Sequence, residues 1–364
     1  MDKVRLLHFS DLHIGVENYG RMDATTGVSG RVLDFLQRFD EVIDYGLQRD
    51  VDLVIFSGDA FKTRDPNPTY QRAFARRVKR LADAEVPVVL LVGNHDLPAM
   101  VQKASSIDIF HTLAVPNVVV GREEKVHWVE TKRGPVQVIT VPYPVRSRLL
   151  NREEYRGLSI AELDQTLRTV VSELIDALKA QLDPDIPAVL TGHFSVSGAV
   201  WGSERSVMLG RDVVVPKSVL ADPAFDYVAM GHIHKHQNLT QGEVGVPPVV
   251  YAGSLERIDF GEENQPKGFC WVELARRATD WEFASVQARR FVTIRVDLRE
   301  TEHNDPTQLV LEAIARHDIE DAVVRLIVQT RPEIEARLQD KEIDAALEPA
   351  NYVAAFVKET EHPE

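Results

Sequence analysis

Short apolar runs alternate with amphipathic stretches along the first hundred residues of this chain. Val4 to Phe9, Val51 to Phe56 and Val86 to Val92 each have the length and apolar character of a buried strand. Residues 31–48 and 70–84 lie between them and carry apolar side chains at helical spacing. Strands that alternate with helices in this way indicate β-α-β units, and therefore a parallel sheet.

The middle of the chain predicts further strands and one long helix. Residues 117–141 suggest β-hairpins with a turn at Gly134-Pro135, and residues 160–182 form a long amphipathic helix. Five more apolar runs are typical of strands, namely 187–190, 226–230, 249–252, 269–274 and 281–286. We therefore predict an α/β fold over residues 1–286, with two packed sheets and helices outside them in a four-layer α/β/β/α sandwich.

The pattern starts again near Gln287. A strand over 291–298, a helix over 306–316 and a strand over 322–328 are followed by a short helix and a last strand over 352–357. These elements predict a separate α+β domain over residues 287–364, about 75 residues long and near the lower end of domain sizes.

Composition excludes several classes of protein. Hydrophobic residues make up 44% of the 364 residues and charged residues 27%, an ordinary globular balance. No apolar run approaches the roughly 20 residues that span a bilayer, and the first residues lack a secretory signal pattern, so we expect no membrane partner. Cys270 is the only cysteine, which excludes an internal disulfide and a thiolate metal cluster and fits the cytoplasm.

The charge of the chain argues against a free-standing nucleic-acid binder. The formal net charge is −14, whereas such proteins are usually basic because neutralising phosphates supplies much of their affinity. If the chain acts on DNA, then bound cations, a local basic strip or a partner protein must supply the attraction.

Five of the predicted strands end in a polar cluster rich in Asp, Asn or His. The clusters are Asp11-x-His13, Gly58-Asp59, Gly93-Asn94-His95-Asp96, Gly192-His193 and Gly231-His232-x-His234. Taken alone, each has an ordinary structural reading, and Gly-Asp after a strand is usually a simple turn. Their shared position changes this, because ligand sites in open α/β sheets lie beyond the carboxyl ends of the strands. We therefore expect the five clusters to converge.

The residue types favour a pair of divalent cations. Imidazole, carboxylate and carboxamide groups without thiolate suit Mn, Fe or Zn, and a mixed oxygen and nitrogen set favours Mn. The candidate ligands are Asp11, His13, Asp59, Asn94, His193, His232 and His234. They are too many for one ion with an open position, and they suit two ions that share a carboxylate. Two ions about 3.5–4 Å apart can hold a phosphate and stabilise both oxygens of an in-line displacement.

One further segment carries a family resemblance. Residues 251–262 read Tyr-Ala-Gly-Ser-Leu-Glu-Arg-Ile-Asp-Phe-Gly-Glu. With this segment and the five clusters, residues 1–260 resemble the calcineurin-like metallophosphoesterase superfamily. Within it, the sequence is most similar to the SbcD nuclease family, the bacterial relatives of the meiotic-recombination-eleven nuclease of DNA double-strand-break repair.

The resemblance implies a function, a cofactor and partners. It implies a metal-dependent DNA nuclease, an exonuclease on duplex ends and an endonuclease on single strands and hairpins, with two divalent ions, Mn favoured. The implied partners are DNA, an SbcC-type (Rad-fifty-like) ABC ATPase and a second copy of the chain in a homodimer. The implied location is the cytoplasm, in association with the nucleoid. Residues 287–364 take the place of the family's DNA-capping domain, after a nuclease domain over 1–286.

The resemblance also assigns a role to each candidate residue. It places Asp11, His13 and His234 on the first ion, Asn94, His193 and His232 on the second, and Asp59 between the two. His95 would contact the scissile phosphate and protonate the leaving oxygen, and Asp96 would orient that imidazole. Many family members have a histidine three residues after the bridging aspartate. Lys62 replaces it here, which leaves the balance of exonuclease and endonuclease action open.

Two alternative functions remain open. The chain could be a phosphoesterase of the same superfamily that acts on cyclic nucleotides or phosphoproteins, although residues 251–262 and the extra domain argue against this. It could also be a non-catalytic scaffold for DNA ends, although every expected ligand position is filled.

Basic side chains that could contact DNA lie on the 70–84 helix and in the loop that follows Pro-Tyr-Pro at residues 142–144. They are Arg72, Arg76, Arg77, Lys79 and Arg80 on the helix, and Arg146, Arg148 and Arg152 in the loop. A solvated helix face is the more ordinary interpretation of the first five.

Overall fold

The computed structural model describes residues 3–98, 103–145, 157–202, 212–300 and 305–361. The chain divides into two compact units, the first made of residues 1–16, 35–256 and 265–287, the second of residues 17–34, 257–264 and 288–364. The assignment of 1–286 as a nuclease domain and 287–364 as a capping domain stays a prediction. Within the described part of the chain, none of the helices is long and apolar enough to cross a membrane.

The first sheet of the first unit contains the three strands that lead into the N-terminal clusters. Its strand order is β14-β13-β1-β2-β3-β4. The parallel strands are β1 (Val4–Phe9), β2 (Leu53–Phe56), β3 (Val88–Leu91) and β4 (Val118–Gly121), with β13 (Gly268–Leu274) and β14 (Asp280–Ser285) antiparallel at one side.

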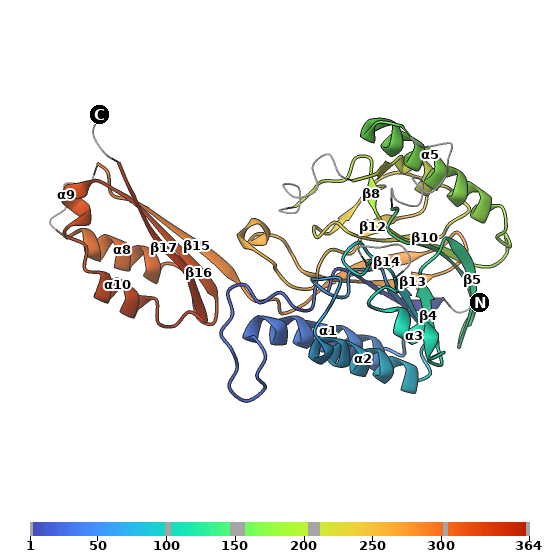
Figure 1. Cartoon of the computed structure of the whole chain (residues 1–364), viewed down its shortest axis with the longest axis horizontal. Coiled ribbons are helices and arrows are strands. Elements are labelled where there is room, and N and C mark those ends of the chain that lie inside the picture. The colour runs from blue at the N-terminus through green and yellow to red at the C-terminus, as the bar shows by residue number, and fades with distance from the viewer. Residues whose placement is uncertain (1–2, 99–102, 146–156, 203–211, 301–304, 362–364) are drawn as a thin grey trace. The chain divides into compact units, whose positions relative to one another are not determined.

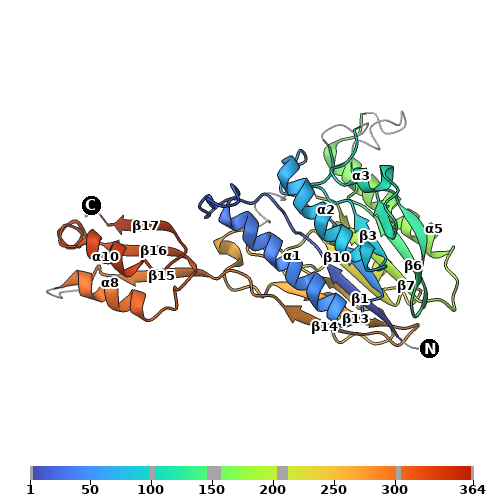
Figure 2. The same cartoon turned by 90° about the horizontal axis from the view of Figure 1, so that it is seen from below.

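Helices α1 (Gly30–Gln48) and α2 (Pro68–Asp83) cover the outer face of this sheet (Figure 2). The packing is aromatic: Phe9 of β1 contacts Phe39 of α1, and Phe56 of β2 contacts Phe74 of α2. Helix α2 begins with Asn67, whose side chain accepts a hydrogen bond from the Thr69 amide, and with a proline in its first turn. These buried phenylalanines hold the helices against the strands. The loops that connect strands to helices therefore lie at the edge of the sheet.

The second sheet supplies the other two clusters. Its order is β11-β12-β10-β7-β6-β5. The parallel strands are β6 (Gly134–Val141), β7 (Ala188–His193), β10 (Tyr227–Gly231) and β12 (Val249–Tyr251), between antiparallel edges β5 (Lys125–Thr131) and β11 (Gln237–Asn238). Helix α5 (Ile160–Lys179) begins with a capping box formed by Ser159 and Glu162. Its buried face, which includes Val171 and Ile175, packs on this sheet.

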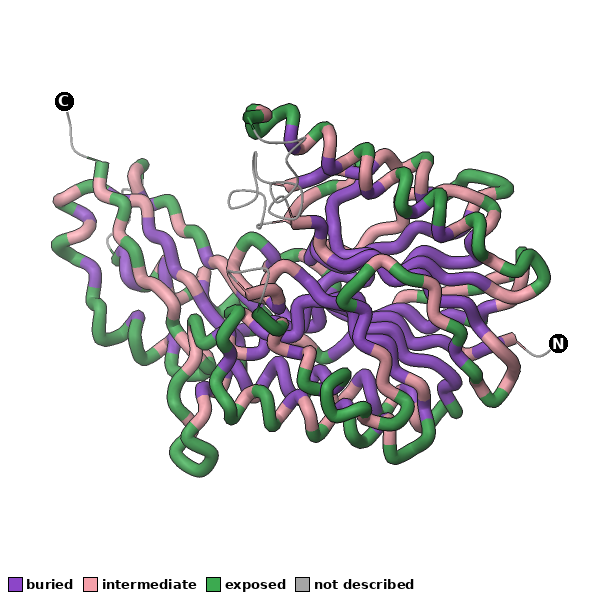
Figure 3. The backbone as a smooth tube through the Cα atoms, turned by 45° about the vertical axis from the view of Figure 1, so that its right-hand side comes forward, coloured by how far each residue is buried: buried purple, intermediate pink, exposed green. Residues whose placement is uncertain are grey.

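The two sheets enclose an apolar core between their inner faces. Leu6, Ile55 and Val89 of the first sheet belong to one buried cluster with Val138 and Val189 of the second. Figure 1 shows the paired sheets between α1 and α2 on one side and α5 on the other, and Figure 3 shows that the strands are the buried part of the unit. The predicted four-layer α/β/β/α sandwich is thereby confirmed.

Shorter elements complete the first unit. They are α3 (Asp108–Thr112), β8 (Ser195–Val196), β9 (Val214–Val215) and α7 (Lys217–Leu220). Strands β8 and β9 pair in parallel as a small separate ladder just after His193. The sequence pattern did not predict this ladder, because two-residue strands leave no periodicity to detect.

The second unit has its own core. Its sheet consists of β15 (Phe291–Asp297), β16 (Val323–Thr330) and β17 (Tyr352–Thr360), all parallel. Helix α8 (Pro306–Ala315) connects the first two strands, and α9 (Pro332–Glu335) and α10 (Asp340–Ala346) connect the last two. Buried side chains from these helices and strands form one apolar cluster.

Two distant segments join this unit, and the sequence did not predict that. The 17–34 segment contributes Asp34, which accepts two hydrogen bonds of 2.6 Å from Arg289. The 257–264 segment contains the short helix η2 (Phe260–Glu262), and the Phe260 ring contacts Phe291 of β15. The Tyr19 ring contacts both phenylalanines. Part of the family-like segment 251–262 therefore belongs to the core of the second unit.

Candidate metal centre

The polar clusters at the strand ends converge, as expected. Asp11 and His13 follow β1, Asp59 follows β2, His193 is the last residue of β7, and His232 follows β10. Asn94 follows β3, and His234 lies two residues beyond His232. The carboxyl edges of the two sheets meet here, so side chains more than 200 residues apart in sequence lie within hydrogen-bond distance of one another.

Four of the seven predicted ligands, including His13 itself, lie together around His13. Its Nε2 atom lies 3.0 Å from Nε2 of His234, 3.7 Å from Oδ2 of Asp59 and 3.9 Å from Oδ1 of Asp11. Each of these four side chains is buried or nearly so. They are the side chains that the resemblance assigns to the first ion and to the bridge.

The other predicted ligands gather around Asn94. Its Oδ1 atom lies 3.0 Å from Nε2 of His193 and 3.0 Å from Nδ1 of His232. The same His193 nitrogen lies 3.3 Å from Oδ2 of Asp59. Asp59 therefore contacts both groups, which is the position that a bridging carboxylate requires.

The chemistry of these contacts fits bound cations. Nδ1 of His193 lies 2.6 Å from the Ser57 carbonyl oxygen and must donate to it, so in the neutral ring Nε2 carries a lone pair. That lone pair points at oxygens of Asn94 and Asp59, which are also acceptors. Acceptors face one another at such distances only when a proton or a cation lies between them. A donor set of imidazoles, carboxylates and one carboxamide suits divalent metals such as Mn or Zn.

The electrostatics of the centre agree with this interpretation. Burial acts to raise the pKa of the Asp59 carboxyl, but His193, His95 and His13 together hold that pKa well below its usual range. Burial acts to lower the pKa of His193, but Asp59 and Asp11 raise it to about 9. The two carboxylates that raise this pKa would likewise attract a divalent cation.

The pKa values of His13 and Asp11 shift in the directions that burial favours. Burial, followed by the nearby His95 imidazole, lowers the pKa of His13 well below its usual value, so this ring is neutral near pH 7. Burial also raises the pKa of Asp11, against the attraction of His193 and His234. Asp11 accepts hydrogen bonds from the Ser10 hydroxyl at 2.5 Å and the His232 amide at 3.1 Å, which hold its carboxylate in place.

The backbone around the centre is strained and closely packed. Asp11, His13, Asp59 and His232 have positive φ angles of 53°, 43°, 62° and 94°, a region that non-glycine residues adopt uncommonly. Gly58 and Gly93 are required for the close approach: a Cβ atom at Gly58 would lie 2.4 Å from Nδ1 of His193, and one at Gly93 would lie 2.2 Å from Oδ1 of Asp59. A side chain at either position would clash with the centre, which explains why glycine precedes Asp59 and Asn94.

His95 lies beside the His13 group with one ring nitrogen engaged. Its ring centroid is 4.8 Å from that of His13, at an interplanar angle of 86°. Its backbone amide donates to Oδ1 of Asp59 at 2.8 Å, and its Nδ1 donates to the Lys62 carbonyl oxygen at 2.7 Å. This contact selects the tautomer with a lone pair on Nε2 in the neutral ring.

Asp96 has a different set of contacts from the one we expected. Its buried carboxylate accepts hydrogen bonds from the backbone amides of Asp59 (2.9 Å), Ala60 (3.0 Å) and Gly93 (3.0 Å). Burial, then repulsion by Asp59, raises its pKa to about 6. Asp96 thus fixes the loops that carry Asp59 and Asn94, whereas the group that orients the His95 imidazole is the Lys62 carbonyl. A backbone carbonyl leaves no trace in a sequence pattern, which is why the resemblance pointed to Asp96 instead.

Two further side chains at the centre were not predicted. Asp212 lies 3.0 Å from Nε2 of His232 through its Oδ2 atom. Lys267, only 2% exposed, donates to the Ser254 hydroxyl at 2.8 Å and to the His234 carbonyl at 3.3 Å. Neither residue belongs to a polar cluster at the end of a predicted strand. The strand-end rule that gave the predicted ligands therefore does not apply to them.

The basic helix face is largely paired within the protein. Arg77 and Arg80 form ion pairs with Asp40, Arg80 also pairs with Asp44, and Lys79 pairs with Asp83. The loop arginines 146, 148 and 152 lie outside the described residues. Contact of these side chains with DNA stays a prediction.

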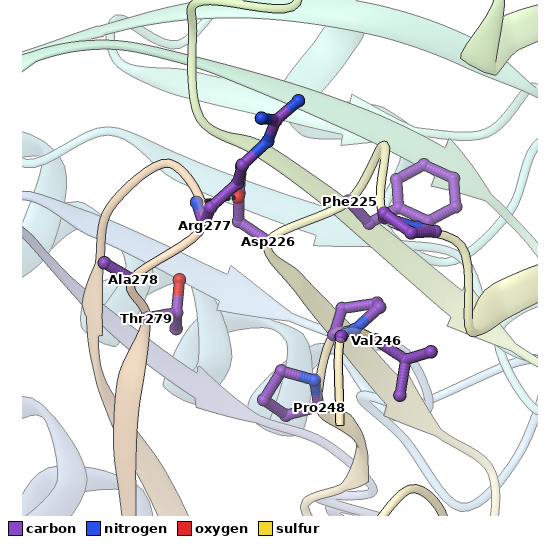
Figure 4. Close-up of a pocket in the computed structure, with 10 residues that line it drawn as sticks. Phe225, Asp226, Val246, Pro248, Arg277, Ala278 and Thr279 are labelled. Atoms are coloured by element: carbon purple, nitrogen blue, oxygen red, sulfur yellow. Dashed lines mark hydrogen bonds between the residues drawn. The ribbon is translucent and has the colours of Figure 1, made fainter. Parts of the chain in front are cut away.

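A separate cavity lies where β10 and β12 begin. It has a volume of about 310 Å³, and Phe225, Val246 and Pro248 are among the residues that line it (Figure 4). Asp226 in its wall is engaged by Arg276 at 2.9 Å and by the Arg277 amide at 2.6 Å. The five residues of β10 span roughly 16 Å, so this cavity lies at the opposite end of the strand from the metal centre.

Comparison with known proteins identifies the family to which the chain belongs. The calcineurin-like phosphoesterase family model matches residues 4–236. The SbcD component of nuclease SbcCD from Escherichia coli (strain K12) is 28% identical over 273 residues, which cover 72% of this chain and 63% of that protein. "DNA double-strand break repair protein Mre11" from Haloferax volcanii is 28% identical over 332 residues, covering 90% and 62%.

The chain thus spans less than two thirds of the length of these two relatives. Their names confirm the resemblance to SbcD and its relatives that residues 1–260 and the 251–262 segment indicated. The family match covers well over half of the chain, and it includes every strand end that contributes a predicted ligand. This chain belongs to the calcineurin-like phosphoesterase family.

Proposed function

We propose that the chain is a two-metal phosphodiesterase that cuts DNA. The observation that carries the proposal is the convergence of seven donor side chains in two groups that share Asp59. The names of the relatives, one a nuclease component and the other a DNA double-strand break repair protein, direct the phosphodiesterase chemistry toward DNA. The mode of cutting that we propose is exonuclease action on duplex ends and endonuclease action on single strands and hairpins.

The proposed ligand sets follow the two observed groups. Asp11, His13 and His234 would hold one divalent ion, Asn94, His193 and His232 would hold the other, and Asp59 would bridge them. Manganese is the favoured metal because the set mixes oxygen with imidazole nitrogen and contains no thiolate. When bound, the two ions would position the phosphate and activate the attacking water molecule.

His95 is the proposed general acid. Its Nδ1–H is committed to the Lys62 carbonyl oxygen, so Nε2 is the atom that would carry a proton to the leaving oxygen. The amide of His95 donates to Asp59, which ties the ring to the bridging carboxylate. Asp96 contributes by holding the amides of Asp59 and Ala60, and so acts on the geometry of the loop.

We also propose partners and a location. An SbcC-type ABC ATPase and a second copy of the chain would assemble with it, in agreement with the name of the E. coli relative, which describes one component of a larger nuclease. The net charge of −14 is consistent with such an assembly, because bound cations, a local basic strip or a partner protein must supply the attraction for DNA. The cytoplasm, in association with the nucleoid, is the proposed location.

The test compares two variants that separate metal binding from proton transfer. His95→Gln should bind Mn²⁺ as the wild type does and lose DNA cleavage by a factor of roughly 10²–10⁴, the usual contribution of a general acid. Asp59→Asn should lose both cleavage and the second equivalent of Mn²⁺. His127→Gln serves as the matched control, because His127 lies on the edge strand β5 and contacts Thr140 rather than the centre.

The assay uses end-labelled duplex, hairpin and single-stranded DNA with Mn²⁺, with a cyclic nucleotide and a phosphopeptide tested alongside. If the cyclic nucleotide or the phosphopeptide were turned over faster than DNA, the alternative phosphoesterase function would be favoured instead. Mn²⁺ binding and DNA-end binding without turnover of any substrate would favour the scaffold. Wild-type DNA cleavage by His95→Gln would refute its role as the acid.

A further inference from the structure

Asp212 makes a buried contact with one of the proposed metal ligands. Its Oδ2 atom lies 3.0 Å from Nε2 of His232, and the two side chains are 4% and 3% exposed. The other nitrogen of that ring, Nδ1, lies 3.0 Å from Oδ1 of Asn94, within the second ligand group. The imidazole of His232 therefore lies between a carboxylate on one side and the ligand group on the other.

Asp212 is held in this position by secondary structure. It immediately precedes Val213 and the strand β9, which pairs with β8 just after His193. The hydroxyl of Ser195 in β8 donates a short hydrogen bond to the same Oδ2 atom.

The Asp212 carboxylate, 3.0 Å from Nε2, fixes the tautomer of His232. The oxygen can only accept, so Nε2 of His232 must carry the proton, and Nδ1 is left with its lone pair toward the ligand group. A carboxylate in this role also makes the imidazole a more basic ligand. His193 and His95 are oriented by the carbonyl oxygens of Ser57 and Lys62, which carry no charge. Asp212 therefore supplies a charge to one ligand of one ion.

We propose that Asp212 is a positioning residue of the metal centre, which orients His232 and raises its affinity for the second ion. The inference rests on the proposed two-metal function, because it assigns His232 to that ion. Among the contacts of the described residues, none joins Asp212 to the group around His13. Loss of Asp212 should therefore weaken the second site selectively.

The experiment titrates the chain with Mn²⁺ by calorimetry and follows the metal by electron paramagnetic resonance. The main variant is Asp212→Asn, which keeps the shape and removes the charge. Asp212→Glu is the second variant, because it restores a carboxylate. Asp226→Asn is the matched control: Asp226 is a fully buried carboxylate that accepts from Arg276, but it lies at the opposite end of β10.

The expected result is selective. Wild type and Asp226→Asn bind two Mn²⁺ and show the spectrum of a spin-coupled pair. Asp212→Asn binds one Mn²⁺ with nearly unchanged affinity and the other about 10- to 100-fold more weakly, so that at limiting metal the spectrum is that of isolated Mn²⁺. Asp212→Glu recovers part of the lost affinity.

Four results would overturn the proposal. Asp212→Asn could bind both ions with wild-type affinity, or Asp226→Asn could weaken binding equally, which would reduce Asp212 to a buried structural carboxylate. A wild-type chain that binds no Mn²⁺ would overturn the metal centre itself and this inference with it. Loss of DNA cleavage with normal binding of both ions would leave the proposal for Asp212 refuted but the proposed function standing.

Discussion

Filling the metal centre should expel one proton, and His193 should be its source. In the metal-free protein, Asp59 and Asp11 overcome the effect of burial and raise the pKa of this imidazole to about 9. An imidazole binds metal only as the neutral ring, so at pH 7 a ligand that is almost fully protonated must first lose its proton. His13 contributes no proton at this pH, because its pKa lies well below the usual value.

The size of the effect follows from the distance between pH 7 and this pKa. Two units below a pKa of about 9, only about 1% of His193 is neutral, so the apparent affinity for the ion is reduced about 100-fold, or roughly 2.7 kcal/mol. The affinity should therefore increase about tenfold per pH unit between pH 7 and 9 and then level off.

The stability of the metal-free chain should change in the opposite direction. A histidine whose pKa is raised on folding, here from 6.5 to about 9, contributes stability fully below pH 6.5. That contribution, on the order of 3 kcal/mol, is lost as the pH rises through 9. Metal should thus rescue stability most strongly in the alkaline part of this range.

Calorimetric titration with Mn²⁺ in buffers of different ionisation heat measures the proton release directly. We expect about one proton per filled centre at pH 7 and none above pH 10. The His127→Gln variant should release the same number as the wild type, because His127 is remote from the centre. An affinity that does not change between pH 7 and 9, or a release of no protons at pH 7, would refute the reasoning.

Three further substitutions test the packing around the centre and in the second unit. Gly93→Ala should lower Mn²⁺ affinity at least tenfold, because the new Cβ atom would lie 2.2 Å from Oδ1 of Asp59; an unchanged calorimetric isotherm would contradict this. Asp96→Ala removes the acceptor of three backbone amides and should cost about 3 kcal/mol or more in urea denaturation of the metal-free chain; a loss below about 1 kcal/mol would mean that water replaces the carboxylate. Asp34→Ala removes one of the partners of Arg31 and of Arg289 and should destabilise the second unit by about 3 kcal/mol. Hydrogen exchange in β15 and β16 measures that loss, and unchanged protection there would count against it.

Much of the fold follows from periodicity alone. The apolar run Val4–Phe9 is β1 residue for residue, and the helical spacing over 31–48 corresponds to α1 (Gly30–Gln48). Such elements bury one face, so their hydrophobic positions repeat at a fixed interval. The strand-end rule then located the seven predicted ligands, because parallel strands bring their carboxyl ends to a common edge.

The features that the sequence could not supply depend on contacts without a periodic or positional signal. Asp212 follows no predicted strand, and its place beside His232 is set by the short β8–β9 ladder. The orientation of His95 depends on a backbone carbonyl at Lys62, which any residue type would provide. Likewise, the ion pair of Asp34 with Arg289 joins residues 255 positions apart in the sequence. Nothing in the sequence distinguishes these two residues from the other charged ones, 42 Lys and Arg and 56 Asp and Glu in all.

The most direct test of the two-metal account is the anomalous diffraction of Mn²⁺ in crystals of the chain grown with that metal. We predict two peaks within about 4 Å of each other, with Asp59 between them and Asn94 beside the second. A single peak, or two peaks that do not share Asp59, would contradict the central claim.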